Sequence, residues 1–135
     1  MLLTKMEIEN DLRKLGVKSG MMLEVHCSLS SFGYVDGGAN TIIEVLKHIV
    51  GINGSIVMPT YKHAHNSPLN EIDKRLGLTI KIKYLKDDEE SSAMGIVADT
   101  FRKMPDVITG EGIFRVSAWG KDAEKHVSSG FQHII

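Results

Sequence analysis

Residues 21–59, MMLEVHCSLSSFGYVDGGANTIIEVLKHIVGINGSIVMP, decide the fold class. Residues 21–25 are a short apolar run that predicts a buried strand. After Asn40 the apolar residues recur at helical spacing, and Gly51 suits the end of that helix. Residues 55–58 predict a second strand, which Pro59 ends. A strand, a helix and a strand in this order are typical of an α/β fold with at least one crossover connection.

The flanking segments extend this pattern. Thr4 followed by Glu7 is a capping box, and it predicts a helix that ends at Gly16. The other predicted elements are a strand at 80–84, a helix opened by Ser91 and Ser92 and closed by Pro105, a strand at 114–119 and a short helix at 121–127. We therefore expect a three-layer α/β/α architecture with a mixed, largely parallel sheet that is incomplete within this chain.

Composition limits the class of protein. The 135 residues, 14.9 kDa, fit a single domain spanning residues 1–135. Hydrophobic residues make up 42%, which argues against intrinsic disorder. A net charge of -1 argues against a nucleic-acid partner, and no apolar run approaches the roughly 18–20 residues of a membrane span. The single cysteine, Cys27, and the N-terminus without a signal-peptide pattern predict a cytoplasmic protein.

Residues 26–40, here called the Ser/Gly loop, carry the strongest chemical signal. They lead from a predicted strand into a predicted helix, whose N-terminus offers free N–H groups and a positive dipole end. Gly37 and Gly38 allow a ligand to approach the backbone, and the serines add hydroxyl groups. These features indicate a phosphate or diphosphate site, although the segment is neither a Walker A loop nor a GxGxxG fingerprint. An ordinary strand–turn–helix connection with capping serines is the alternative that these residues leave open.

A family resemblance bears on this choice. Residues 25–61, VHCSLSSFGYVDGGANTIIEVLKHIVGINGSIVMPTY, resemble the N-terminal signature of the aminoglycoside 3-N-acetyltransferase family, V-H-S-S-L-S-S-x-G-x-V-x-G-G-A followed by a helix and G-T-L-V-M-P-T. Three further blocks are similar to the family and follow in the same order: LRKLGVKSGMMLEVH at 12–26, SSAMGIVADTFRKMPDV at 91–107 and FRVSAWGKDA at 114–123.

The resemblance implies acetyl-coenzyme A as co-substrate and acetyl transfer to a small-molecule amine, with an aminoglycoside as the candidate acceptor. It implies that the thioester lies near Pro59-Thr60-Tyr61, that backbone N–H groups serve the phosphates and that serine hydroxyls add contacts. The implied cofactor-binding residues are Ser28, Leu29, Ser30, Ser31, Gly33, Val35, Gly37, Gly38 and Ala39.

The family's His-Pro dipeptide, which includes a proposed base, lies a few residues before S-x-x-A-x-G. Aligned on Ser117 without gaps, this chain has Glu111 and Gly112 there, so Glu111 is the candidate catalytic base. A carboxylate can serve as a base when burial raises its pKa, whereas an exposed loop glutamate is the alternative. The acidic run at 87–90 suits a polycationic acceptor or, alternatively, a solvated face.

Other constellations are weaker. His63 and His65 would lie on one side of a strand, and His26 adjoins Cys27, but the spacing matches no closed zinc motif, so we expect no metal. Serine is common in the family where Cys27 stands, which favours a small buried residue over a nucleophile. Family members are about twice as long as this chain. A truncated, catalytically inactive coenzyme-A-binding remnant is therefore the second hypothesis, and the oligomeric state stays open.

Overall fold

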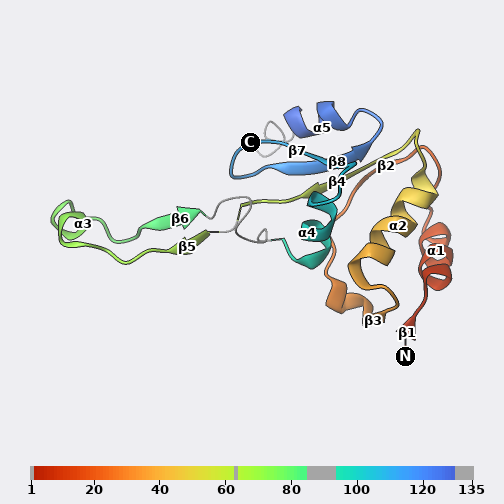
Figure 1. The fold of residues 1–135 in the computed structure, drawn as a ribbon, viewed down its shortest axis with the longest axis horizontal. Helices are drawn as coiled ribbons and strands as arrows, with labels where there is room; N and C mark the ends of the chain where they lie inside the picture. Colours follow the sequence, from red (N-terminus) through yellow and green to blue (C-terminus); the bar gives the residue numbers. More distant parts are fainter. Residues whose placement is uncertain (1, 63, 85–93, 130–135) are drawn as a thin grey trace.

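The computed structural model describes residues 2–62, 64–84 and 94–129. Figure 1 shows the order and placement of the elements. They are β1 (Leu2–Leu3), α1 (Lys5–Lys14), β2 (Met22–Glu24), the 3-10 helix η1 (Leu29–Phe32), β3 (Tyr34–Val35), α2 (Gly38–Val50), β4 (Ser55–Pro59), β5 (Ala64–Asn66), α3 (Glu71–Arg75), β6 (Ile82–Tyr84), α4 (Ile96–Arg102), β7 (Ile108–Thr109), β8 (Val116–Gly120) and α5 (Ala123–Ser129).

The main sheet has four strands in the order β2-β4-β8-β7. Strands β2 and β4 are parallel, and α2 forms the crossover between them, which confirms the predicted α/β class and mixed sheet. However, β8 pairs antiparallel with both β4 and β7, so antiparallel pairs predominate, contrary to our expectation of a largely parallel sheet. For β7 and β8 the reason is the short loop that joins them, which permits antiparallel pairing without a crossover helix.

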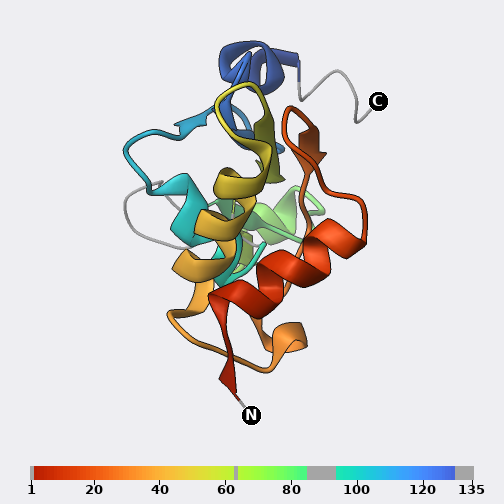
Figure 2. The ribbon, with the colours of Figure 1, turned by 90° about the vertical axis from the view of Figure 1, so that its right-hand side faces the viewer.

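Helices cover both faces of this sheet, as Figure 1 and Figure 2 show. Helices α2 and α4 contact β4 on one face, and α1 lies against α2. Helix α5 packs against β4, β7 and β8 on the opposite face. The predicted three-layer arrangement is therefore present in the described residues.

Helix α2 supplies much of the core because its apolar side chains recur every three to four residues. It begins at Gly38, two residues before the predicted start, and ends as predicted at Gly51, whose φ of 68° suits glycine. The buried apolar side chains that line this core include Ile42, Ile43, Leu46, Ile49 and Val50 of α2, together with Ile56, Met58, Val97 and Phe101 of its neighbours. This packing fixes α2 against the sheet and so positions both of its ends.

The helix starts follow the local signals. The predicted capping box of α1 is present: Glu7 N donates to Thr4 Oγ1 at 3.3 Å, and Thr4 N donates to Glu7 Oε2 at 2.9 Å. Helix α4 begins after Gly95 with its Val97 buried, and the predicted opening serines lie outside the described residues. Ile96, the first residue of α4, is 56% exposed.

Strand β2 differs from the prediction of a buried strand. Met22 is 57% exposed and Glu24 is also exposed, whereas Leu23 is half-buried. In the described sheet β2 is an edge strand that pairs with β4. Leu23 packs against the core, so Met22 and Glu24 project from the opposite face, where α5 packs against β4, β7 and β8. The apolar run at 21–25 indicated a strand correctly, but not its burial.

A hairpin-like arm extends from the body of the molecule (Figure 1). Strands β5 and β6 pair antiparallel, and α3 lies between them. The sequence predicted a strand at 80–84 but not β5 or α3. Helix α3 has its own capping box, in which Asn70 and Asp73 cap each other's backbone N–H groups at 2.7 and 3.0 Å. Within the described residues, no helix has the length and apolar character needed to cross a bilayer.

Candidate functional site

The Ser/Gly loop turns sharply after β2 and prepares the entry to α2. Residues Leu29–Phe32 form one 3-10 turn, which ends at Gly33 with a φ of 76°. The hydroxyl groups of Ser28 and Ser30 lie 2.9 Å apart and share a hydrogen bond. Because both side chains are on exposed positions of the loop, their remaining hydrogen-bonding capacity is available to a ligand.

A surface pocket of about 890 Å³, here called the outer pocket, lies beside this turn. It contains four of the predicted cofactor-binding residues, Ser28, Leu29, Ser30 and Gly33. The sequence missed the other lining residues as site residues: Cys27, Tyr34, Met94, Gly95 and Ile96. Met94 and Gly95 belong to the M-G of the block at 91–107, so a signal for them was present in the resemblance. The start of α4 thus forms the second wall of the pocket.

The other five predicted cofactor-binding residues are not among the described residues that line the outer pocket. Ser31 is exposed within the same 3-10 turn, and Val35 packs against the core. Ala39 is buried in that core, so its side chain does not face a ligand. Gly37 and Gly38 lie at the start of α2, where they have only backbone groups with which to contact a ligand.

The start of α2 has glycine geometry. Gly37, its N-cap, has a φ of 86° and Gly38 a φ of 63°. A Cβ on Gly37 would collide with Thr41 Oγ1, which donates a hydrogen bond to Asp36 O. Glycine at the N-cap provides no side chain to accept from the first N–H groups of the helix, so these remain suited to an anion.

A smaller pocket of about 280 Å³, the inner pocket, lies at the carboxyl ends of β2 and β4. It is lined by Val25, His26, Cys27, Ser28, Met58, Pro59, Met94 and Ala98. Pro59, near which the thioester is expected, is thus one of its lining residues. The side chain of Thr60 points toward β8 instead, and its hydroxyl lies 2.9 Å from Ser117 Oγ. The ring of Tyr61 packs edge-on against that of Phe114, with 5.4 Å between the ring centres.

Cys27 lines both pockets. It is half-buried, and this burial raises the pKa of its thiol. A raised pKa leaves less thiolate at neutral pH, which is the opposite of what a nucleophile needs. The structure therefore agrees with a small packing residue at this position.

Glu111, the candidate base, lies on the loop between β7 and β8 and is exposed. The burial on which its role depended is thus not provided by the described residues. It does not line the outer or the inner pocket.

Three histidines, His26, His63 and His65, were considered in the sequence as candidate metal ligands. His26 Nε2 lies 3.2 Å from Glu24 Oε1 on the exposed edge strand. His63 and the side chain of His65 lie outside the described part of the structure. In the part that is described, no three His, Cys, Asp or Glu side chains are grouped to hold a metal ion. The acidic run at 87–90 also lies outside the described residues.

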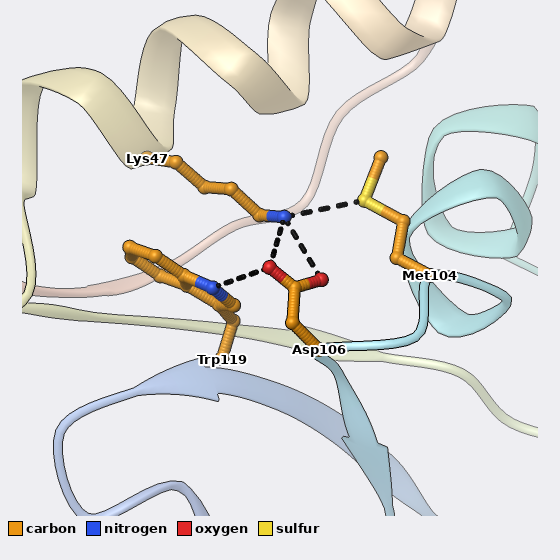
Figure 3. Close-up of polar contacts among 4 residues, drawn as sticks. All are labelled: Lys47, Met104, Asp106 and Trp119. Carbon is orange, nitrogen blue, oxygen red and sulfur yellow. Dashed lines mark hydrogen bonds and ion pairs between the residues drawn. The ribbon is translucent and has the colours of Figure 1, made fainter.

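The last turn of α2 is fixed to the sheet by a polar cluster around Lys47 (Figure 3). Lys47 Nζ donates to both carboxylate oxygens of Asp106 at 2.9 and 3.1 Å, and it lies 5.4 Å from the ring centre of Trp119. Trp119 Nε1 also donates to Asp106 at 2.9 Å. The hydrogen bond from Lys47 is the main cause that lowers the pKa of Asp106.

Comparisons with known proteins identify the family of this chain. The family described as aminoglycoside 3-N-acetyltransferase matches residues 25–130. The SPbeta prophage-derived aminoglycoside N(3')-acetyltransferase-like protein YokD of Bacillus subtilis (strain 168) is 34% identical over 134 residues, which cover 90% of this chain and 48% of YokD. The crystal structure of YokD superposes with a TM-score of 0.77 at 31% identity, covering 95% of this chain and 51% of that chain.

Two solved complexes share the fold. AAC-IIIb in a binary complex with CoASH has a TM-score of 0.74 at 19% identity, covering 95% of this chain and 50% of AAC-IIIb. A mutant of the aminoglycoside acetyltransferase AAC(3)-IVa in complex with apramycin has a TM-score of 0.68 at 29% identity, covering 92% and 46%. The chain thus spans about half the length of these relatives. Because the family match extends over most of its residues, the chain belongs to the aminoglycoside 3-N-acetyltransferase family.

Proposed function

We propose that this chain binds acetyl-coenzyme A at the Ser/Gly loop and takes part in acetyl transfer to a small-molecule amine. One observation carries the proposal: the outer pocket joins Ser28, Leu29, Ser30 and Gly33, within the segment that matches the family. An open pocket of about 890 Å³ is large enough for an extended cofactor arm.

The two ends of the cofactor need different surroundings. The diphosphate would lie at the start of α2, where Gly37, Gly38 and Ala39 present backbone N–H groups and the helix dipole favours negative charge. The pantetheine arm would follow the outer pocket toward Pro59, with hydrogen bonds to the hydroxyl groups of Ser28 and Ser30. The complex of AAC-IIIb with CoASH supports coenzyme A as the ligand class.

The transfer step requires a neutral amine. Its nitrogen attacks the thioester carbonyl, the C–S bond of the tetrahedral intermediate breaks, and coenzyme A leaves as a thiol once the proton lost by the amine is delivered to it. Glu111 remains our proposed base for this proton. An aminoglycoside acceptor is supported by the apramycin complex of AAC(3)-IVa. We place the protein in the cytoplasm, and residues 1–135 correspond in this proposal to the cofactor-binding half of the longer relatives.

A second candidate function is coenzyme A binding without turnover. It is favoured by the exposed position of Glu111, which does not line the outer or the inner pocket. An acetyltransferase needs the donor, the acceptor and the base together, whereas a binding remnant needs only the first.

Titration calorimetry with acetyl-coenzyme A tests the shared part of both candidates. We expect binding to the wild-type chain and a two- to tenfold loss in Ser30→Ala, because about 0.5–1.5 kcal/mol is typical of one hydrogen bond. Ser19→Ala is the matched control: the same residue type is removed at an exposed position that lines neither pocket, and the affinity should stay within twofold of wild type. No heat of binding at millimolar ligand would refute the cofactor assignment.

An acetylation assay then separates the two candidates. Release of the coenzyme A thiol is followed with kanamycin-type acceptors and with simple amines. Turnover that is lost in Glu111→Gln at unchanged cofactor affinity supports the transferase with Glu111 as base. Binding without thiol release from any acceptor supports the remnant.

A further inference from the structure

The inner pocket continues from the outer pocket toward the core. The two pockets adjoin, because they share Cys27, Ser28 and Met94, so a ligand in the outer pocket can reach the inner one. The inner pocket lies where β2 and β4 end, and Ala98 of α4 forms part of its wall. A coenzyme A thioester bound as proposed above would therefore direct its acyl group into this space.

The walls of the inner pocket are mainly apolar. Val25, Met58, Pro59 and Ala98 contribute hydrocarbon or thioether surface, and Met58 and Ala98 belong to the buried core. The Cys27 thiol adds a small side chain that stays neutral at physiological pH. His26 and Ser28 are the polar members of the lining, and the rest of it suits a hydrocarbon chain.

The volume of the inner pocket exceeds what an acetyl group needs. A cavity of about 150 Å³ already accommodates benzene, which has six carbons. The inner pocket measures about 280 Å³ and is partly open to the surface. The acetyl group brings a single methyl group beyond its carbonyl and would leave most of this space unfilled.

We propose that the inner pocket is an acyl-chain site, and that this chain binds coenzyme A thioesters of four to six carbons more tightly than acetyl-coenzyme A. The inference rests on the proposed coenzyme A site but goes beyond it, because it names the donor class and the residues that select it. Ala98 has the smallest side chain of the apolar wall and so leaves space for the acyl chain. We expect the size of the side chain at this position to set the longest acyl chain that fits.

Calorimetry of the unmodified chain with coenzyme A and with acetyl-, butyryl- and hexanoyl-coenzyme A tests the proposal. Each fully buried methylene group contributes about fourfold in affinity, so butyryl-coenzyme A should bind up to roughly 15-fold more tightly than acetyl-coenzyme A. Hexanoyl-coenzyme A should bind at least as tightly as butyryl. If coenzyme A binds but affinity stays level or falls with chain length, the acyl-chain site is refuted and the cofactor site stands. If none of the four binds, the proposed function itself fails.

A pair of variants assigns the effect to the inner pocket. Ala98→Leu places an isobutyl group in the space, and the ratio of hexanoyl- to acetyl-coenzyme A affinity should fall toward one. Ala123→Leu is the matched control, because it makes the same change on α5, on the opposite face of the sheet. An unchanged ratio in a folded Ala98→Leu protein contradicts the proposal. If Ala98→Leu does not fold, as judged by its thermal transition, the wild-type series decides.

Discussion

Replacing Asp106 by Asn tests how the last turn of α2 is held to the sheet. The Asp106 carboxylate accepts from Lys47 Nζ through both oxygens and from Trp119 Nε1 through one. Asparagine has nearly the same shape but no charge, so it keeps a single acceptor oxygen and brings two N–H donors toward Lys47. The variant therefore removes the ion pair with little change in volume.

The magnitude follows from the unequal exposure of the two partners. The side chain of Asp106 is 52% exposed, whereas that of Lys47 is only 12% exposed. Exposed ion pairs contribute about 0.2–1 kcal/mol, and hydrogen bonds to charged groups about 1.5–3 kcal/mol. Solvent screening at Asp106 places the pair near the lower of these ranges, while the burial of Lys47 raises the cost of losing its partner. We expect Asp106→Asn to lower the free energy of unfolding by about 1–2 kcal/mol.

A double-mutant cycle in urea measures this coupling. The four proteins are wild type, Asp106→Asn, Lys47→Met and the double variant. Trp119 is the single tryptophan and donates to Asp106, so its fluorescence reports both unfolding and the cluster itself. The coupling energy should be about 1 kcal/mol, whereas additive effects within roughly 0.3 kcal/mol would refute a cooperative cluster.

The pH dependence provides an independent check. The pKa of Asp106 is lowered in the folded protein, first by the hydrogen bond from Lys47. Its stabilising contribution is therefore complete above the unfolded-state value of about 3.9 and is lost as the pH falls through the lower folded value. The stability difference between wild type and Asp106→Asn should shrink below about pH 4. A difference that stays constant from neutral pH into this acidic range would contradict the assigned ion pair.

Three further predictions concern the anion site, a close backbone contact and a buried hydroxyl. Gly38→Asp should weaken acetyl-coenzyme A about tenfold relative to Gly38→Asn, since both residues tolerate a φ of 63° and only the first adds like charge; equal affinities would place the diphosphate elsewhere. Gly54→Ala should lower the free energy of unfolding in urea by about 1–3 kcal/mol, because its Cβ would lie 2.6 Å from Met21 O and 2.7 Å from Val50 O. An unfolding midpoint equal to that of wild type would show that these carbonyl groups move aside without cost. Ser117→Ala should cost about 1–3 kcal/mol in the same assay, since this buried hydroxyl bridges two threonine hydroxyls at 2.7 and 2.9 Å, and a change below about 0.5 kcal/mol would contradict that bridge.

Sequence patterns predicted the elements that are stabilised by contacts between neighbouring residues or by one apolar face. The capping box at Thr4 and the apolar periodicity of α2 act within a few turns of helix, and both are present in the structure. The two-residue strand β7 has too few residues for a pattern of its own. It is a strand because Ile108 and Thr109 pair with β8. The antiparallel placement of β8 depends in the same way on partners far along the chain.

The same distinction applies to the candidate site, where some residues are neighbours in the sequence and others are brought together only by the fold. The Ser/Gly loop was recognisable because its serines and glycines are consecutive and precede a helix. Met94 and Gly95 come more than fifty residues after this loop, and only the fold brings them to the outer pocket. Glu111 was assigned by an ungapped alignment on Ser117, and that register carries no information on burial. Its exposed position follows from the loop between β7 and β8.

Cys27 shows how a site can constrain a residue by space instead of reactivity. Its position between two pockets requires a small side chain, because a larger one would occupy the region that both pockets share. The serine common in the resembled family meets the same requirement. Cysteine differs by replacing a hydroxyl with a more polarizable and less polar group, which suits a half-buried position beside Val25 and Met58. The apolar character of the inner pocket and the residue type at position 27 are thus consistent with one property, a space that favours hydrocarbon over water.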